Sequence, residues 1–174
     1  MTAKAIIGAA LLAAIPAAAT SQQVIGEITA TLDGEERSWQ TLGHGPDSYN
    51  TGLTDFGFGM YQVSIHGFPD GRPGIRGSLQ IVFGGMEGGD DPTEVEILYI
   101  PERMSQSYAL PEDDAARAGA LVLDRLEADG NEGFAAGRIS AMLCFKEGFM
   151  ATPDPDDCIT VEGRFETALL LEDF

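Results

Sequence analysis

Apolar and polar residues alternate with a period of two along much of the chain, a pattern typical of half-buried β-strands. The alternation is clearest where Ile28 and Leu32 fall on one face and are followed by Asp33-Gly34, a pair that favours a tight type I′ turn. In a hairpin closed by that turn, Leu32 faces Glu35 and Ile28 faces Trp39. We therefore expect a hairpin here, with the only tryptophan of the chain on its inward side.

Later segments of the chain alternate in the same way. We expect further strands over residues 76–83, 93–100, 136–146 and 158–171. The block from Phe56 to Phe68 carries apolar residues on both faces, with Phe56, Phe58 and Met60 on one and Tyr61, Val63 and Ile65 on the other. A strand that is apolar on both faces is typically a central one, so we predict a central strand here.

Residues 111–118 carry the signals of a short helix. Pro111 suits a first helical turn, and the acidic run after it suits the positive end of the helix dipole. Gly119 limits this helix to two turns. Residues 120–127 fit either an extension of the helix or a strand, and we predict a strand because the turn pair Asp129-Gly130 follows.

These elements predict an all-β fold with about eight or nine strands and one short helix near 111–118. We expect one domain over residues 20–174, either a single antiparallel β-sandwich or a partly open barrel. Residues 1–19 read as a secretory signal peptide: Lys4 supplies a positive start, Ala5 to Ile15 an apolar stretch, and Ala17 to Ala19 a small-residue cleavage site.

The apolar stretch of this signal is shorter than the ~20 residues that a membrane-spanning helix needs. A buried N-terminal helix is the alternative, but the segment has no polar face to expose. We therefore expect export to the periplasm or the extracellular space, with no membrane insertion of the mature chain.

Three segments carry a resemblance to a known group of proteins: Thr29 to Trp39 near the predicted mature start, and Gly137 to Leu143 and Val161 to Thr167 near the end. They resemble the opening and closing hairpins of uncharacterised exported bacterial β-sandwich proteins. Many of those relatives are lipoproteins, and this chain departs from them because it lacks the lipid-accepting cysteine. These families carry no assigned chemistry, so the resemblance implies a fold but no functional residue.

The chain has two cysteines, Cys144 and Cys158, and an oxidising compartment favours a disulfide between them. Each falls on the polar side of its predicted strand, so both lie on the outer face if the two strands pair with the cysteines opposite each other. This register also places Arg138 opposite Arg164, a like-charge pair that Ser140, Glu162 and Glu166 are expected to relieve. A redox or metal-binding pair is the alternative, but the chain has no Cys-x-x-Cys motif.

The chain is strongly acidic: 28 Asp and Glu against 10 Lys and Arg give a formal net charge of −18 over 174 residues. Proteins bind nucleic acids by neutralising phosphates with Lys and Arg. This composition therefore predicts no nucleic-acid partner. A protein or a small ligand is the expected partner.

Candidate catalytic and metal-binding residues are few. The two histidines, His44 and His66, lie 22 positions apart, and no Gly-x-Ser-x-Gly elbow accompanies them. His66 shares its predicted face with Ser64, which indicates a solvated surface histidine. We assign no catalytic, cofactor-binding or metal-ligating residue.

Other residue groups leave alternatives open. The acidic runs 87–91, 112–114 and 154–157 are oxygen-rich enough for calcium, although none matches the Asp-x-Asp-x-Asp-Gly loop. The five methionines after residue 19 are spread singly, which favours core filling or chance over a copper site. An aromatic cluster is either pocket lining or core; its members are Tyr49, Phe56, Phe58, Tyr61 and Phe68.

The leading hypothesis from the sequence is a non-catalytic, exported, acidic β-sandwich that acts as a binding or accessory module. A calcium-stabilised adhesive or envelope-structural protein is the alternative. A hydrolase that uses carboxylates is a third, which requires two acids at a fixed separation.

Overall fold

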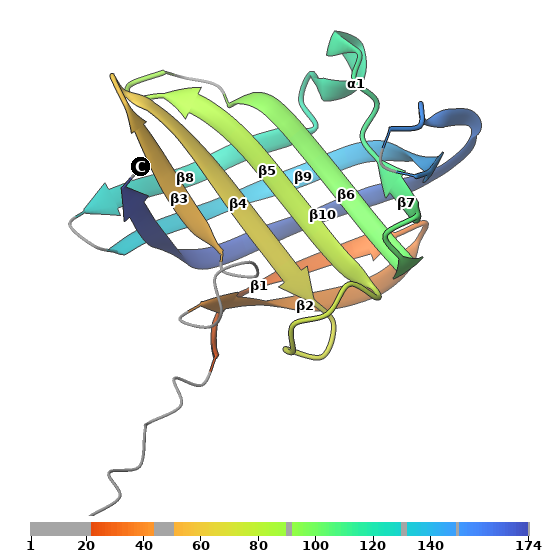
Figure 1. Ribbon diagram of the computed structural model, residues 1–174, viewed down its shortest axis with the longest axis horizontal. Helices are drawn as coiled ribbons and strands as arrows, with labels where there is room; N and C mark the ends of the chain where they lie inside the picture. Colours follow the sequence, from red (N-terminus) through yellow and green to blue (C-terminus); the bar gives the residue numbers. More distant parts are fainter. Residues whose placement is uncertain (1–21, 44–50, 90–91, 130–131, 149, 174) are drawn as a thin grey trace, which may run out of the picture.

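The structure, a computed structural model, describes residues 22–43, 51–89, 92–129, 132–148 and 150–173. In these residues the chain forms ten strands and one short helix, so the predicted all-β class is confirmed (Figure 1). The predicted signal segment, 1–19, lies outside the described residues. The elements are β1 (Gln23–Leu32), β2 (Glu35–Gly43), β3 (Gly52–Gly57), β4 (Met60–Phe68), β5 (Ser78–Met86), β6 (Thr93–Arg103), β7 (Gln106–Ala109), α1 (Asp114–Arg117), β8 (Leu121–Asp129), β9 (Glu132–Glu147) and β10 (Asp154–Asp173).

The ten strands form one sheet whose hydrogen bonding closes on itself. Neighbouring strands follow the order β2-β1-β10-β3-β4-β5-β6-β7-β9-β8, and β10 also pairs with β9. The strands β10-β3-β4-β5-β6-β7-β9 therefore make a closed circuit, which we call the strand ring. In Figure 1, β4, β5 and β6 run in front of β8, β9 and β10 at a steep angle.

Two long strands make this closure possible because each is shared between two neighbours. One edge of β10 pairs with β1 over residues 161–167 and then with β3 over residues 170–173. One edge of β9 pairs with β8 over residues 132–139 and with β7 over residues 144–147. The remaining edges of β9 and β10 pair with each other.

The finer fold prediction is corrected in three respects. Ten strands replace the expected eight or nine, and one ring-bonded sheet replaces the sandwich of two sheets, which was one of the two expected architectures. The sheet is also mixed, because β10 and β3 run parallel. Period-two alternation reports which face of a strand is buried, but it does not report which strand lies on which edge.

The first hairpin is confirmed in its register. Leu32 pairs with Glu35 and Ile28 with Trp39, as the Asp33-Gly34 turn predicts. The Trp39 side chain is 1% exposed, and its indole N–H donates a hydrogen bond to the Gly77 carbonyl at 2.7 Å. The tryptophan therefore anchors β2 to the segment that leads into β5.

The prediction of one central strand over 56–68 is wrong. The segment is a hairpin in which β3 ends at Gly57 and β4 begins at Met60. Phe58 lies at the turn with φ 57° and is 96% exposed. Three positive-φ residues in succession, Gly57, Phe58 and Gly59, make this turn, and the glycines adopt that backbone without the cost that a side chain imposes.

The short helix and the strand predicted for residues 111–127 are both present, but the helix is shorter than predicted. It covers only Asp114–Arg117, and Pro111 lies before it. Asp113 caps α1, because its carboxylate accepts a hydrogen bond from the Ala116 N–H at 2.9 Å, and Gly119 (φ 76°) follows the helix. The chain then continues as strand β8. The sequence did not predict the short strand β7, which joins β6 to β9 in the strand ring. Within the described residues, no helix is both long and apolar enough to cross a membrane.

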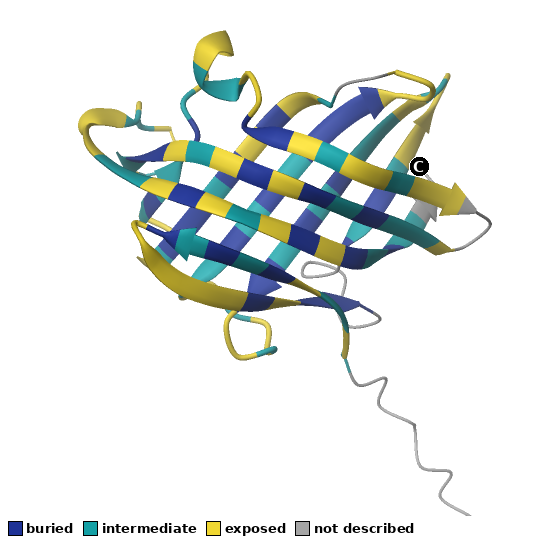
Figure 2. Cartoon of the chain, turned by 180° about the vertical axis from the view of Figure 1, so that it is seen from behind, coloured by how far each residue is buried: buried dark blue, intermediate teal, exposed yellow. Residues whose placement is uncertain are grey.

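The apolar core lies on the inward faces of the strands. Figure 2 shows buried and exposed positions alternating along the strands, the pattern from which they were predicted. Gly67 of β4 has no side chain at the point where β4 approaches β2, and a Cβ there would lie 2.8 Å from atoms of Ile28 and Trp39. The largest fully buried side chains are Trp39, Phe68, Phe83, Ile28, Leu42, Ile65, Leu79, Ile81, Ile97, Ile139, Leu143 and Leu169.

Candidate ligand-binding site

A cavity of about 640 Å³ opens at one end of the strand ring, and we call it the mouth cavity. This volume falls within the roughly 300–1,000 Å³ that is usual for small-molecule sites. Its walls are the tip of the β3–β4 hairpin, the segment after β5, and β8. The lining residues are Leu53, Asp55, Gly59, Met60, Tyr61, Met86, Glu87, Gly88, Gly89, Leu123, Asp124, Arg125, Leu126, Ala128 and Leu171.

Four leucines supply much of the apolar part of the lining. Leu53 is a buried member of the core, and Leu123, Leu126 and Leu171 are half-buried and pack against the core. The mouth cavity therefore continues the apolar interior outward. An apolar ligand here would cover leucine surface that is now partly exposed, which is the main source of affinity in such sites.

A row of three residues crosses the β3, β4 and β5 wall of the mouth cavity. Asp55 pairs with Tyr61, and Tyr61 pairs with Gly85 on its other side. The tyrosine ring lies over Gly85, because a Cβ there would be 2.2 Å from the Tyr61 hydroxyl oxygen. Burial raises the pKa of Tyr61 above its ordinary value.

This row places a carboxylate on the inward side of the sheet. Paired residues point their side chains to the same face, and Tyr61 packs against the core. Asp55 therefore faces inward, although its position at the open end leaves it exposed. Its carboxylate accepts a hydrogen bond from the Gly57 N–H at 2.7 Å, which holds it at the start of the turn.

The rim is formed by two hairpin tips that are joined to each other. Met60 pairs with Met86, and the Glu87 N–H donates to the Gly59 carbonyl at 2.7 Å. Both methionines are exposed lining residues. Of the two alternatives expected for the methionines, core filling is wrong, because Met104, Met142 and Met150 are exposed as well.

Two ion pairs neutralise the charged side chains on the β8 wall. Arg138 donates to Asp124 at 2.9 Å, and Arg125 donates from two nitrogens to Glu127. The Arg125 guanidinium also lies 4.6 Å from the centre of the Phe134 ring. The hydrogen bond with Glu127 raises the pKa of Arg125, and the same contact lowers the pKa of Glu127.

The aromatic cluster of the sequence is divided by the fold. Tyr61 lines the mouth cavity, Phe68 is 2% exposed in the core, and Phe56 and Phe58 are exposed near the hairpin tip. Tyr49 lies outside the described residues. The leucines and acids of the cavity come from four distant segments, so alternation alone did not reveal them.

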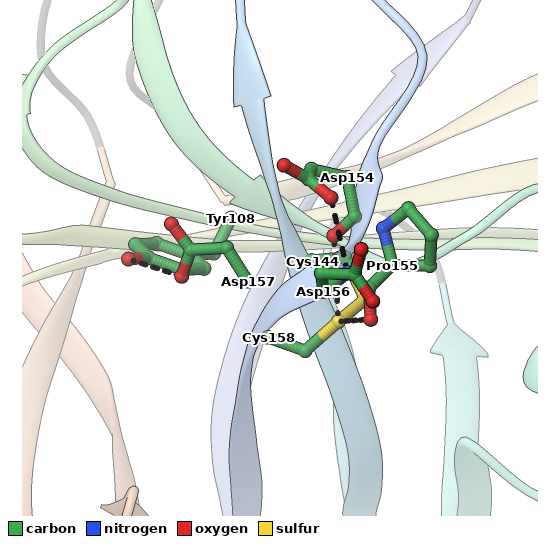
Figure 3. Close-up of a disulfide and its surroundings, with 7 residues drawn as sticks. All are labelled: Tyr108, Cys144, Asp154, Pro155, Asp156, Asp157 and Cys158. Atoms are coloured by element: carbon green, nitrogen blue, oxygen red, sulfur yellow. Dashed lines mark hydrogen bonds between the residues drawn. A yellow bond between two sulfur atoms is a disulfide. The ribbon is translucent and has the colours of Figure 1, made fainter.

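The predicted disulfide between Cys144 and Cys158 is present, with the two residues directly opposite each other on β9 and β10 (Figure 3). Their Cα atoms lie 4.0 Å apart. The chain bulges between Asp154 and Cys158, and the Cys158 sulfur lies 3.4 Å from the Pro155 carbonyl oxygen. Cys144 is 4% exposed, whereas Cys158 is half-buried.

Tyr108 of β7 reaches the same bulge. Its hydroxyl donates to the Asp157 carboxylate at 3.3 Å, and its ring meets the Phe145 ring edge-on, with centres 5.6 Å apart. Burial raises the pKa of Tyr108, and the nearby Asp157 charge raises it further. These contacts join β7 to the bulged start of β10 and to β9.

Arg138 lies opposite Arg164, as the cysteine register predicts. Ser140, Glu162 and Glu166, which were expected to relieve the repulsion between the two arginines, are not the ion-pair partners of Arg138. Its partner is Asp124 of β8, at the bulge between Leu123 and Arg125. This contact could not be predicted from the sequence, because it depends on β8 lying beside β9.

His66 lies on the predicted face of β4, but the prediction of a solvated side chain is wrong. It is half-buried, with its ring 3.5 Å from the Gln80 amide nitrogen, and burial lowers its pKa from 6.5. It is not among the residues that line the mouth cavity. His44 lies outside the described residues.

This burial predicts a pH dependence of stability. Because the folded pKa is below the unfolded value of 6.5, the unfolded chain takes up the proton first. The contribution of His66 to the free energy of unfolding is therefore fully present above the unfolded pKa of 6.5. It is lost as the pH falls through the folded pKa. We expect the free energy of unfolding, measured with urea, to change less between pH 7.5 and 5.5 in His66→Gln than in wild type. Parallel pH curves for the two proteins would contradict this.

Acidic residues of the runs 112–114 and 154–157 form local hydrogen bonds with the backbone. Asp113 caps α1, and the Asp154 carboxylate accepts a hydrogen bond from the Asp156 N–H at 3.0 Å. Asp90 and Asp91 of the first run lie outside the described residues. In the part of the chain that the structure covers, no three His, Cys, Asp or Glu side chains gather closely enough to hold a metal ion.

Comparisons with protein-family models, with curated proteins and with solved structures find no match for this chain. The mouth cavity therefore stands on its own geometry: four leucines, one tyrosine, two exposed methionines and an acidic rim.

Proposed function

We propose that this chain is a non-catalytic, exported binding protein that holds a small apolar ligand in the mouth cavity. The observation that carries the proposal is the cavity itself, whose four lining leucines continue the core of the strand ring toward the surface. Export is supported by the signal pattern of residues 1–19 and by the disulfide, which persists in oxidising compartments.

The lining also favours binding over covalent chemistry. Six of the fifteen lining residues are leucine or methionine, and Asp124 and Arg125 are both engaged in ion pairs. Apolar contact supplies affinity at such a surface, while the few polar groups at the rim fix orientation.

Titration with N-phenyl-1-naphthylamine, a neutral apolar dye, tests the proposal. We expect a saturable rise in fluorescence with one site per chain. Leu126→Trp should weaken this binding about tenfold or more, equivalent to roughly 1.4 kcal/mol, because the larger ring occupies the cavity.

Met142→Trp is the matched control, since it places the same ring on an exposed outward position of β9. It should leave dye binding unchanged. Wild-type protein without a saturable signal, or equal losses in the two variants when both remain folded by circular dichroism, would contradict the proposal.

A further inference from the structure

The charges around the mouth cavity are not balanced. Among the charged lining residues, Asp124 is paired with Arg138 and Arg125 with Glu127. Neither Asp55 nor Glu87 belongs to an ion pair within the described residues. The lining therefore presents two negative charges without cationic partners, beside an apolar interior.

Asp55 and Glu87 lie where the polar end of a bound ligand would reach. Asp55 lies on the inward face in the same cross-strand row as Tyr61, and Glu87 follows Met86 at the rim. Gly59 and Glu87 are joined by a backbone hydrogen bond, so the two tips that carry the acids are held together. A ligand whose apolar part contacts Leu53 and Leu126 would present its polar end to this rim.

We infer that the mouth cavity selects an organic cation with an apolar body, such as an alkylammonium. This inference rests on the proposed function and names the chemical class of its ligand. A positive head group would pair with Asp55 and Glu87, and the Tyr61 ring would add a favourable aromatic face. The formal net charge of −18 further raises the local concentration of cations near the protein.

Competition between matched amphiphiles tests the inference. Decylammonium, decanol and decanoate share a ten-carbon chain and differ in head-group charge at pH 7. Each should be titrated below its micellar concentration against bound N-phenyl-1-naphthylamine. We expect decylammonium to displace the dye at a concentration about tenfold below decanol, with decanoate weakest, because two unpaired carboxylates favour a cation and repel an anion. Raising the salt concentration should narrow the difference, since exposed charges are screened.

Asp55→Asn is the decisive variant, because the asparagine oxygen can still accept the Gly57 hydrogen bond that holds the turn. It should weaken decylammonium binding about five- to tenfold, and it should weaken decanol binding much less. Asp70→Asn is the control: Asp70 is an exposed acid in the turn after β4, at the other end of that strand from the mouth cavity. It should behave like wild type.

Three results would overturn the inference. Equal displacement by the three amphiphiles would remove the charge preference while leaving the apolar site, and with it the proposed function, in place. Equal effects of Asp55→Asn and Asp70→Asn would assign the preference to the charge of the whole chain. Absence of dye binding by wild-type protein would instead contradict the proposed function itself.

Discussion

Trp39→Ala is expected to lower the free energy of unfolding by about 3–5 kcal/mol, the usual cost of truncating a buried aromatic residue. Trp39 is 1% exposed, lies opposite Ile28 on β1, and bonds to the Gly77 carbonyl before β5. Its removal therefore leaves a hole in the core and an unsatisfied carbonyl at once. Urea unfolding followed by circular dichroism measures the loss, since the variant has no tryptophan fluorescence.

Trp39→Phe separates the two contributions. The phenyl ring keeps much of the buried volume but cannot donate to Gly77, so the expected loss is about 1–3 kcal/mol. In wild-type protein, the single tryptophan should also shift its emission to longer wavelength on unfolding. A Trp39→Ala variant as stable as wild type would show that β2 is not anchored at this position.

Cys144→Ser is expected to lower the free energy of unfolding by about 3 kcal/mol in oxidising buffer. The disulfide closes a loop of 14 positions between Cys144 and Cys158, and a loop of this length contributes about that much by restricting the unfolded chain. For a chain of this size the loss corresponds to a fall in Tm of roughly 6–12 °C. Thermal unfolding monitored by circular dichroism measures it.

Cys158→Ser should give a similar fall, and wild-type protein in excess reductant should unfold near the temperature of the variants. A thiol assay on denatured, unreduced wild-type protein should find no free cysteine. Two reactive thiols in that assay, or an unchanged Tm in both variants, would contradict a structural disulfide.

The features that could be predicted from the sequence are those set by residues close together in the chain. The Asp33-Gly34 turn fixes the register of the first hairpin, and the parity of Cys144 and Cys158 fixes the register of the last. In each case a short segment is enough to predict the register, because side chains on a strand alternate between its two faces.

The features that were missed depend on which strands become neighbours. The parallel pairing of β10 with β3 has no local signal, and neither has the contact between Arg138 and Asp124. The Phe56 to Phe68 block was misread because a turn with positive φ at Phe58 breaks the parity.

The mouth cavity was missed for the same reason. Leu53, Leu126 and Leu171 are ordinary strand leucines in the sequence, and only closure of the ring brings them to one opening. The aromatic cluster gave a partial signal through Tyr61, although its other described members lie elsewhere.

The shared strand β10 has a consequence for how the molecule forms. It follows every other strand along the chain, yet it bonds to β1, β3 and β9, and the hydrogen bond from Thr31 to Glu162 spans 131 positions. Contacts between such distant segments are slow to form, because a long stretch of backbone loses conformational entropy before the contacts stabilise the fold. Until β10 arrives, the edges of β1 and β3 stay unpaired and open to association with other chains, so a helper that shields these edges would raise the yield of native protein.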